Sequence, residues 1–330
     1  MLVCDCCFND REMQIEICNE ASGVGVCECC NQYSSLVNIE HFSDFFKSIL
    51  SLFEPNNDGH TITEIIQKDW NLFVSNEVGK LILEYFLNKG DYSFSVNDKV
   101  EYKSSIRKAI LIWDELKIQV REKTRFFTSL SYFDDNKIIT SNTIIPKGTK
   151  LYRARVIPSN KRYLNKKEMG CPPKEKATAG RANPIGIPYL YLCQDEATTY
   201  YEVRALYLDM ISVGIFEVNR NLNILDFTSE LSLYYAFNNA SDSLENILCK
   251  HKLLQLISHD LSKPLRRFDT ELEYVPTQLI CEYCKTCGID GIKFYSSLHK
   301  QGINVVLFNQ ESANCIKVNS KEIKCVNISV

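Results

Sequence analysis

The chain has 330 residues, of which 45% are hydrophobic and 24% are charged, with a net charge of −3 and fifteen cysteines. This apolar fraction excludes a largely disordered chain, and no apolar run approaches the ~18–20 residues that a membrane-spanning helix needs. The N-terminus lacks the basic and then apolar segment of a secretory signal. We therefore expect a cytoplasmic protein whose cysteines are metal ligands, buried side chains or reactive thiols rather than disulfides.

Charge is unevenly distributed along the chain. Residues 1–150 hold 16 Lys and Arg against 22 Asp and Glu, whereas the remainder holds 22 against 19. The stretch from Lys147 to Arg181 contains eleven basic residues and two acidic ones. This local excess of positive charge favours an anionic ligand, although a solvated basic loop would have the same composition.

Seven of the fifteen cysteines lie in the first thirty residues. The sequences CDCC at 4–7 and CECC at 27–30 each contain a Cys-x-x-Cys pair, and nineteen residues separate the two. This spacing is typical of a structural zinc site with four thiolate ligands. The regularly spaced ligands are Cys4, Cys7, Cys27 and Cys30. Because Cys6, Cys18 and Cys29 lie nearby, the choice of four stays open, and reduced thiols without metal are the alternative.

The region after the cysteines has helical periodicity. Apolar side chains recur at i, i+3, i+4 and i+7 in residues 40–53, 76–88 and 102–125. Such stripes predict helices that share a hydrophobic core. Pro146 and Gly148 mark the end of this region. We therefore predict a zinc-ribbon-like unit at 1–35 followed by an all-α helical domain at 36–145.

After Lys150 the chain alternates short apolar runs with helical segments. The predicted strands are Lys150–Val156, Pro188–Cys193, Val213–Val218, Leu222–Asp226, Gly291–Tyr295, Ile303–Phe308 and a last run near Ile323–Ile328. The predicted helices are 196–208, 243–259 and 276–287. Because strands and helices do not alternate regularly, the order indicates an α+β domain over 146–330.

A second group of cysteines, Cys281, Cys284 and Cys287, lies in the last predicted helix. Residues three apart share one helix face, so we expect these thiols to pack in the core. His299 is the nearest residue that would serve as a fourth ligand, and we predict no metal there.

The segment GRANPIGIPYLYLCQDEATTYYEVR at 180–204 carries the candidate chemistry. Arg181 precedes a strand with tyrosines, and Glu202 lies on the helix that follows. An arginine fork suits phosphate, a tyrosine ring stacks on a flat heterocycle, and a carboxylate holds a ribose hydroxyl or stabilises positive charge at a sugar carbon. We expect these side chains to converge at one cleft.

Four separated motifs, in order, resemble the RES domain family, which is named for its Arg, Glu and Ser. They are LYRAR at 151–155, GRANPIGIPYLYL at 180–192, YEVR at 201–204 and DGIKFYSSLHKQGINVVLF at 290–308. The resemblance spans roughly residues 147–315. The residues before it resemble the zinc-containing helical segment, called HEPN/RES N-terminal, that precedes some RES domains, through Cys-x-x-Cys-Phe near the start and KDWNLF at 68–73.

The resemblance implies both a fold and an activity. RES domains are similar to ADP-ribosyltransferases, which implies a split β-sheet around an NAD cleft. Several members are toxins that destroy NAD by hydrolysis or phosphorolysis of the nicotinamide–ribose bond. The chain is therefore expected to be an NAD+ glycohydrolase or phosphorylase that also holds structural Zn2+. The expected setting is a toxin or antiviral defence effector with an antitoxin or trigger protein, as a homo-oligomer and without a membrane partner.

The motifs also carry over individual residues. The catalytic residues implied are Arg181, Tyr191, Glu202 and Ser296. The residues implied to bind NAD are Arg153, Arg155, Tyr189 and Ser297. Because the closing motif reads Tyr-Ser-Ser, Ser297 competes with Ser296 for the family position. Ala182 follows the motif arginine, where the family often has Trp or Phe.

The chemistry is consistent with a single carboxylate. Nicotinamide departs as a neutral molecule, so no acid is needed to protonate it. The site needs only to stabilise the positive charge that develops on the ribose and to position a nucleophile, either water or phosphate. One alternative is an ADP-ribosyltransferase that modifies a macromolecule. Another is a zinc-dependent nucleic-acid-binding protein, which the acidic N-terminal half opposes because a phosphate backbone needs a basic face.

Overall fold

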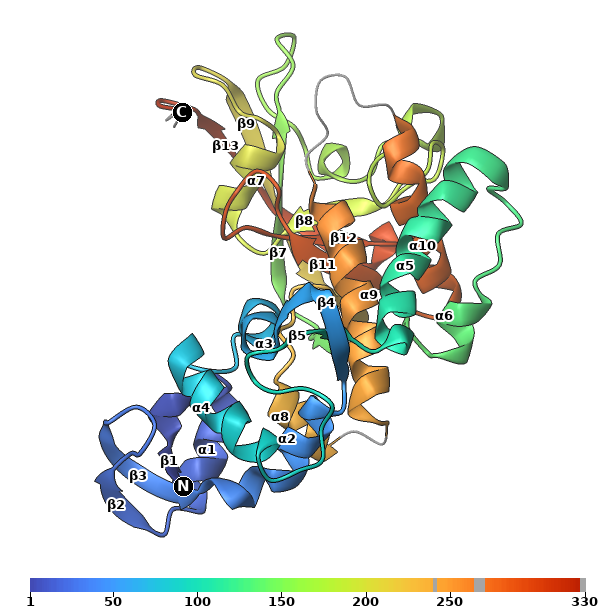
Figure 1. Ribbon diagram of the computed structural model, residues 1–330. Coiled ribbons are helices and arrows are strands. Elements are labelled where there is room, and N and C mark those ends of the chain that lie inside the picture. Colours follow the sequence, from blue (N-terminus) through green and yellow to red (C-terminus); the bar gives the residue numbers. More distant parts are fainter. Residues whose placement is uncertain (240–241, 264–270, 327–330) are drawn as a thin grey trace. The chain divides into compact units, whose positions relative to one another are not determined.

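The chain folds into two units (Figure 1). The computed structural model describes residues 1–239, 242–263 and 271–326. Unit 1 comprises Met1–Leu111 and Glu230–Lys252, and unit 2 comprises Ile112–Ser229 and Leu253–Val330. The chain therefore contributes to each unit twice, and the domain boundary expected at residue 145 lies inside unit 2.

The cysteine-rich start of unit 1 is a three-stranded antiparallel sheet in the order β1-β3-β2. Its strands are β1 (Leu2–Cys4), β2 (Gly23–Val26) and β3 (Tyr33–Asn38). The 3-10 helix η1 (Asp5–Cys7) and helix α1 (Arg11–Asn19) follow β1. The Asp10 side chain caps α1 by accepting from two backbone N–H groups of the first turn. Sequence periodicity missed α1 because Met13 and Ile17 are its only buried residues.

The remainder of unit 1 combines helices with a hairpin. Its helices are η2 (Ile39–Phe42), α2 (Ser43–Leu50), α3 (Ile62–Trp70), α4 (Asn76–Leu87) and α8 (Leu233–Asn239), and α5 (Ser104–Ile118) and α9 (Leu244–Ser262) begin here. The prediction of an all-α domain at 36–145 is wrong, because β4 (Phe53–Thr61) pairs with β5 (Lys99–Tyr102). Val100 and Tyr102 are buried while Lys99 is exposed, and this alternation forms a strand rather than a helix.

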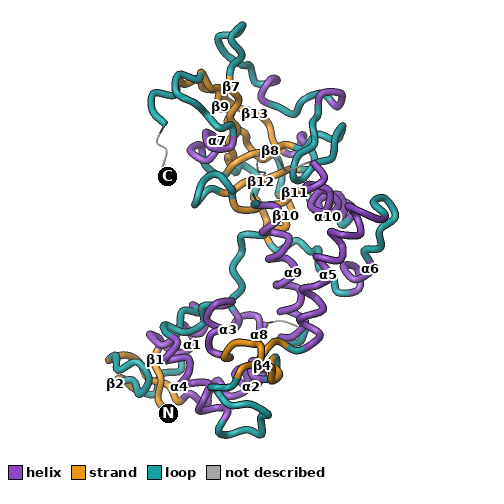
Figure 2. The backbone as a smooth tube through the Cα atoms, turned by 45° about the horizontal axis from the view of Figure 1, so that its top comes forward, coloured by secondary structure: helices purple, strands orange, loops and turns teal. Residues whose placement is uncertain are grey.

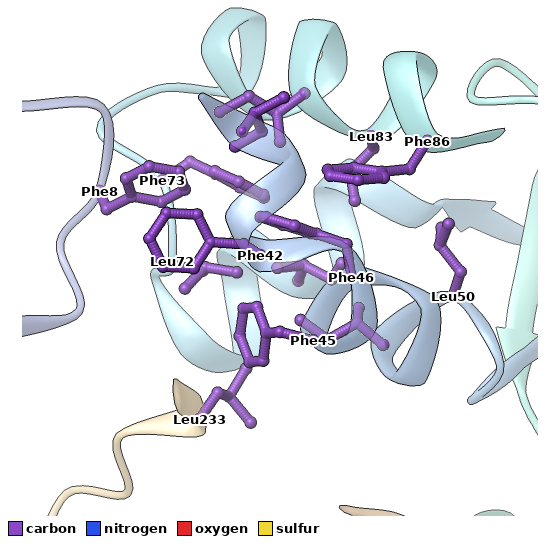
Figure 3. Packing of buried hydrophobic residues seen from close by; sticks show 14 of the residues in the cluster. Phe8, Phe42, Phe45, Phe46, Leu50, Leu72, Phe73, Leu83, Phe86 and Leu233 are labelled. Atoms are coloured by element: carbon purple, nitrogen blue, oxygen red, sulfur yellow. The ribbon is translucent and has the colours of Figure 1, made fainter. Parts of the chain in front are cut away.

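Aromatic and aliphatic side chains together form the core of unit 1 (Figure 3). The Phe46 and Phe86 rings stack with their centroids 4.8 Å apart, and Phe45 meets Tyr234 of α8 edge to face at 5.3 Å. Tyr234 and Leu233 belong to the same buried cluster. This packing explains why the segment Glu230–Lys252 belongs to unit 1.

Unit 2 contains a mixed sheet of eight strands in the order β13-β9-β7-β8-β12-β11-β10-β6 (Figure 2). The strands are β6 (Thr143–Ile145), β7 (Lys150–Val156), β8 (Leu190–Cys193), β9 (Met210–Val218), β10 (Leu222–Asp226), β11 (Gly291–Tyr295), β12 (Ile303–Leu307) and β13 (Ala313–Glu322). β10 and β11 run parallel, and the other neighbours are antiparallel. The mixed α and β architecture is confirmed. The expected split sheet is not confirmed, because all eight strands belong to one hydrogen-bonded sheet. The contact between β7 and β8 is short, with a single register pair, Tyr152 with Cys193.

Six predicted strands are confirmed, and the last one is wrong. The final strand β13 ends at Glu322, and residues 323–326 are not in a strand, while 327 and 328 lie outside the described residues. The sequence of β13 is mostly polar because this edge strand is largely exposed, so it has no apolar run to detect. The predicted helix 196–208 ends early, as α7 (Glu196–Glu202), and Arg204 follows with a left-handed φ of 51°.

Unit 2 also contains helices and helical turns. They are the second parts of α5 and α9, the π-helical turn η3 (Gln119–Lys123), α6 (Ser131–Asp135), η4 (Lys167–Met169), η5 (Lys174–Lys176), α7, η6 (Glu271–Tyr274), α10 (Val275–Thr286) and η7 (Gln310–Ser312). Trp113 of α5 is fully buried and donates from Nε1 to Asp260 Oδ2 at 2.7 Å. This contact explains why the residues after Leu111 belong to unit 2.

Two further expectations concern helices. Cys281 and Cys284 of α10 are buried in the core of unit 2, which confirms core packing for these two thiols. The expectation is wrong for Cys287, which follows the last residue of α10 as its C-cap and is exposed. Among the described residues, no helix is both long and apolar enough to cross a lipid bilayer.

Candidate functional site

Two consecutive serines in the turn between β11 and β12 connect the arginine and the glutamate predicted from the sequence. Ser296 Oγ donates to Glu202 Oε1 at 2.6 Å, and Ser297 Oγ accepts from Arg181 Nη2 at 3.1 Å. Residues far apart in the sequence therefore meet at one place. Each serine contacts a different charged side chain, so both serines of the Tyr-Ser-Ser motif lie at this place.

Glu202 is the last residue of α7, the helix that follows β8. Its Oε1 also accepts from Asn304 Nδ2 of β12 at 2.8 Å. Its Oε2 has no hydrogen-bond partner within the described part of the chain, and the residue is exposed. The carboxylate is thus held through one oxygen and presents the other to solvent.

Ser296 is fixed by its own turn. Its Oγ accepts from the backbone N–H groups of Leu298 and His299, both at 3.1 Å, and its backbone N–H donates to the Gly302 carbonyl at 2.8 Å. A hydroxyl has one hydrogen, and these contacts leave it directed at Glu202. The serine is buried, so its orientation is set by the fold.

Asn304 and Cys193 extend this network and were not predicted from the sequence. Cys193 Sγ donates to Asn304 Oδ1 at 3.3 Å, and the two residues are register partners in the sheet. A carboxylate only accepts, so the amide nitrogen of Asn304 must face Glu202 and its oxygen the thiol. Burial, reinforced by Glu202 and Asp195, raises the pKa of Cys193 and keeps this thiol protonated as a donor.

The loop that carries Arg181 is held by α10 and β8. Gln278 Nε2 donates to the carbonyls of Gly180 and Asn183 at 2.8 and 3.0 Å. The Tyr191 hydroxyl donates to Asn183 Oδ1 at 2.8 Å and accepts from the Ala182 N–H at 3.1 Å. Burial raises the pKa of Tyr191. The hydroxyl of Tyr191 therefore supports the loop of Arg181.

Gly180 is required by this close packing. A Cβ atom at this position would lie 2.6 Å from Asn183 Oδ1 and 2.7 Å from the Tyr191 hydroxyl. Both distances are shorter than van der Waals contact allows, so a side chain here would displace the loop. The glycine before Arg181 thus has a steric role.

Arg153 and Arg155 lie two residues apart on β7 and share an acceptor. Arg153 Nη1 and Arg155 Nη2 donate to the Gly170 carbonyl at 3.2 and 2.7 Å. Burial, together with the charge of Arg155, lowers the pKa of Arg153 to about 10, so Arg153 is charged at neutral pH. Burial also lowers the pKa of Arg155. Tyr152, the residue before Arg153, pairs with Cys193 in the sheet, so Arg153 lies near the strand position that carries the Glu202 network.

Tyr189 is not brought together with these side chains. It is 2% exposed in the core of unit 2, and its ring centroid lies 5.0 Å from that of Phe308. The ring therefore has no exposed face on which a ligand could stack.

The four regularly spaced cysteines converge in unit 1. The Sγ atoms of Cys4, Cys7, Cys27 and Cys30 all lie within 4.8 Å of one another. The shortest separations are 3.3 Å between Cys4 and Cys30 and 3.4 Å between Cys7 and Cys27. Tetrahedral zinc with Zn–S bonds of about 2.3 Å places its sulfur atoms about 3.8 Å apart, so this cluster fits a metal ion of that size.

The other N-terminal cysteines stand outside this cluster. Cys6 and Cys18 are exposed, and Cys29 Sγ contacts Met1 Sδ at 3.5 Å. The geometry therefore favours the four ligands with regular spacing.

Comparison with known proteins identifies one family. The model of the RES domain matches residues 150–325, which is more than half of the chain and includes both serines, Arg181 and Glu202. The match does not extend to the first 149 residues, so the resemblance to HEPN/RES N-terminal segments stays a prediction. No curated protein matches the chain.

Among solved structures, a toxin-antitoxin complex is similar over part of the chain. It is described as the crystal structure of the M. tuberculosis MbcT-MbcA toxin-antitoxin complex. The matched chain has 13% sequence identity and a TM-score of 0.34, and the match covers 58% of this chain and 93% of that one.

Proposed function

Because the chain belongs to the RES domain family, we propose that it is an enzyme that consumes NAD+ by cleaving the bond between nicotinamide and ribose. The observation that carries this proposal is the chain of contacts from Glu202 through Ser296 and Ser297 to Arg181. It joins a carboxylate suited to a ribose with a guanidinium suited to a phosphate. In NAD+ the ribose that carries the reacting C1′ atom is attached to the pyrophosphate, so one molecule would contact both side chains.

Glu202 supplies the charge that bond cleavage needs. When the C–N bond breaks, nicotinamide leaves as a neutral molecule and positive charge develops at C1′ of the ribose. The free Oε2 of Glu202 stabilises this charge or holds a ribose hydroxyl, while the hydrogen bonds to Oε1 fix the orientation of the carboxylate. One carboxylate suffices because the leaving group needs no acid.

Arginines bind the pyrophosphate. Arg181 has five N–H donors, and its contacts with Leu261 and Ser297 leave others for phosphate oxygens. Arg155 Nε is buried and has no hydrogen-bond partner among the residues that the structure describes. With Arg153, Arg155 places two guanidinium groups on one strand, and their positive charge favours an anion nearby. Tyr191 acts through the loop of Arg181, and we assign Tyr189 no contact with NAD+.

The remaining parts of the proposal concern nucleophile and setting. The nucleophile is water or phosphate, since the same charge stabilisation serves both. The setting is a toxin or antiviral defence effector in the cytoplasm, controlled by an antitoxin or a trigger protein and acting as a homo-oligomer. The support for this setting is the resemblance to RES domains.

The cysteine cluster of unit 1 holds a Zn2+ ion in this proposal. Its support is the convergence of four thiols at separations near those of a tetrahedral site. Four thiolates leave no position open for substrate, so the role of the ion is structural.

The test is release of nicotinamide by the purified full chain, with and without inorganic phosphate. We expect the wild type to release nicotinamide, and the nearly isosteric Glu202→Gln variant to lose at least about 100-fold in kcat with an unchanged circular dichroism spectrum. Glu175→Gln, an exposed carboxylate in the basic stretch, is the matched control and should keep wild-type activity. Intact NAD+ under both conditions contradicts the proposal. Transfer of ADP-ribose to a protein would indicate a transferase instead.

A further inference from the structure

Asp195, Thr198 and His299 form a chain of hydrogen bonds beside Glu202. Thr198 Oγ donates to Asp195 Oδ2 at 2.7 Å and contacts His299 Nδ1 at 2.8 Å. Thr198 is fully buried, and Asp195 also accepts from the Thr198 N–H at 2.8 Å, as the N-cap of α7. The sequence assigned His299 no catalytic role, because its hydrogen-bond partner Thr198 lies 101 residues away.

This chain determines the tautomer of His299. The threonine hydroxyl has a single hydrogen, and it is directed at the Asp195 carboxylate. Burial acts to raise the pKa of Asp195, but hydrogen bonds from Thr198 and the nearby His299 outweigh it and lower the pKa, so the carboxylate is ionised. His299 Nδ1 must therefore donate to Thr198, and in the uncharged form of the ring the lone pair lies on Nε2.

His299 lies close to the carboxylate proposed to act on NAD+. Its backbone N–H donates to Ser296 Oγ, and the Ser296 hydroxyl donates to Glu202. Its ring stacks on that of Tyr201, the neighbour of Glu202, with centroids 4.5 Å apart and planes 3° apart. Tyr201 is 51% exposed, and His299 Nε2 has no hydrogen-bond partner in the described parts of the chain. The hydrogen bond to Thr198 and the stacking on Tyr201 therefore fix the orientation of the imidazole, and Nε2 stays open to a ligand.

We propose that His299 Nε2 is the base that activates the attacking water in NAD+ cleavage; this inference rests on the proposed function. As the water oxygen bonds to C1′ of the ribose, its O–H bond breaks and the proton goes to Nε2. The C1′–N bond breaks, and its electron pair goes to the nicotinamide ring, which leaves uncharged. Asp195, through Thr198, and the Tyr201 ring stabilise the imidazolium that results.

The test compares water with azide, an anionic nucleophile that has no proton to lose, in phosphate-free buffer. We expect His299→Ala to lower kcat for hydrolysis about 100-fold, while azide or added imidazole restores much of the rate. Glu202→Gln should stay slow with both nucleophiles. Thr198→Val, which removes the hydroxyl and keeps the shape, should lower hydrolysis about tenfold. His259→Ala, an exposed histidine of α9, is the matched control and should react as the wild type does.

Several outcomes would overturn the inference. One is an active His299→Ala variant, and another is an equal loss with water and azide, which indicates a structural role. Nitrogen-15 NMR of the wild type should show the proton on Nδ1, and a proton on Nε2 overturns the inference without reference to activity. A wild type that leaves NAD+ intact overturns the proposed function and the base together, whereas an active wild type with insensitive variants overturns the base alone.

Discussion

At the scale of the residue, neighbouring serines divide two tasks. Ser296 is buried and orients the carboxylate of Glu202, while Ser297 accepts a hydrogen bond from the guanidinium of Arg181. Hydrogen bonds to charged groups contribute about 1.5–3 kcal/mol each, so both contacts are large enough to change a rate or an affinity. They act on different parts of the proposed substrate.

This division predicts different kinetics for two serine variants. Ser296→Ala removes one of the two donors to Glu202 Oε1, so we expect kcat for NAD+ to fall at least about tenfold with little change in KM. Ser297→Ala removes a contact that orients Arg181 toward phosphate, so we expect KM to rise several-fold with little change in kcat. Steady-state nicotinamide release measures both. Identical effects of the two variants would contradict the assignment.

At the scale of the element, the loop before β8 depends on close packing. Gly180 approaches Tyr191 and Asn183, and Gln278 of α10 binds two carbonyls of the loop. Arg181 has its position because a helix and a strand hold its loop from both sides. The position of Arg181 therefore depends on the close packing of β8 and α10 around Gly180.

Gly180→Ala tests this coupling. Its Cβ would meet oxygen atoms at 2.6 and 2.7 Å, so the loop must shift and Arg181 must move with it. We expect at least about a tenfold loss in kcat/KM for NAD+. Overpacking should also lower the free energy of unfolding by about 1–3 kcal/mol, which a lower melting temperature would show. Gly23→Ala is the matched control, because nothing lies within 4 Å of its Cβ. A fully active Gly180→Ala protein would show that the loop tolerates the shift.

The elements also show what the sequence can predict. Strands such as β10 and β11 were found because their apolar runs are buried in the sheet, whereas β13 was missed because most of its residues are exposed. The same rule holds for the site. Arg181, Glu202 and Ser296 were predicted because each lies in a recognisable motif. Asn304 and Cys193 were not, because their contact depends on strand register, which no local pattern encodes.

At the scale of the whole molecule, the chain builds each unit from two segments. Leu248 of α9 belongs to the core of unit 1 and Leu253, five residues later, to that of unit 2. Similarly, Ile106 and Trp113 of α5 belong to different cores. Periodicity predicts such a helix but not which core each turn joins. The division of the chain into units therefore depends on tertiary packing. The four cysteines that converge, Cys4, Cys7, Cys27 and Cys30, all belong to unit 1.

Metal removal should act on unit 1. Cys4, Cys7 and Cys27 belong to the same buried core as Phe8 and Met13, and the half-buried Cys30 packs against it. Bound Zn2+ would therefore contribute its binding free energy, of order 10 kcal/mol, to the folding of these residues. We expect about one Zn2+ per chain by mass spectrometry. A strong chelator or Cys4→Ser should remove the ion and abolish amide hydrogen-exchange protection in β1 and β3.

The strands of unit 2 report whether this effect is local. Because the sheet from β7 to β12 has its own core, we expect its amides to keep their protection after chelation. Cys6→Ser, at an exposed thiol beside the cluster, is the control and should keep both the metal and the protection of β1. A metal-free wild type with a protected β1 would contradict the zinc proposal, because the four thiols would then be stable as packed, reduced side chains. Equal loss of metal in Cys6→Ser and Cys4→Ser would instead mean that the ligand set differs from the regularly spaced four.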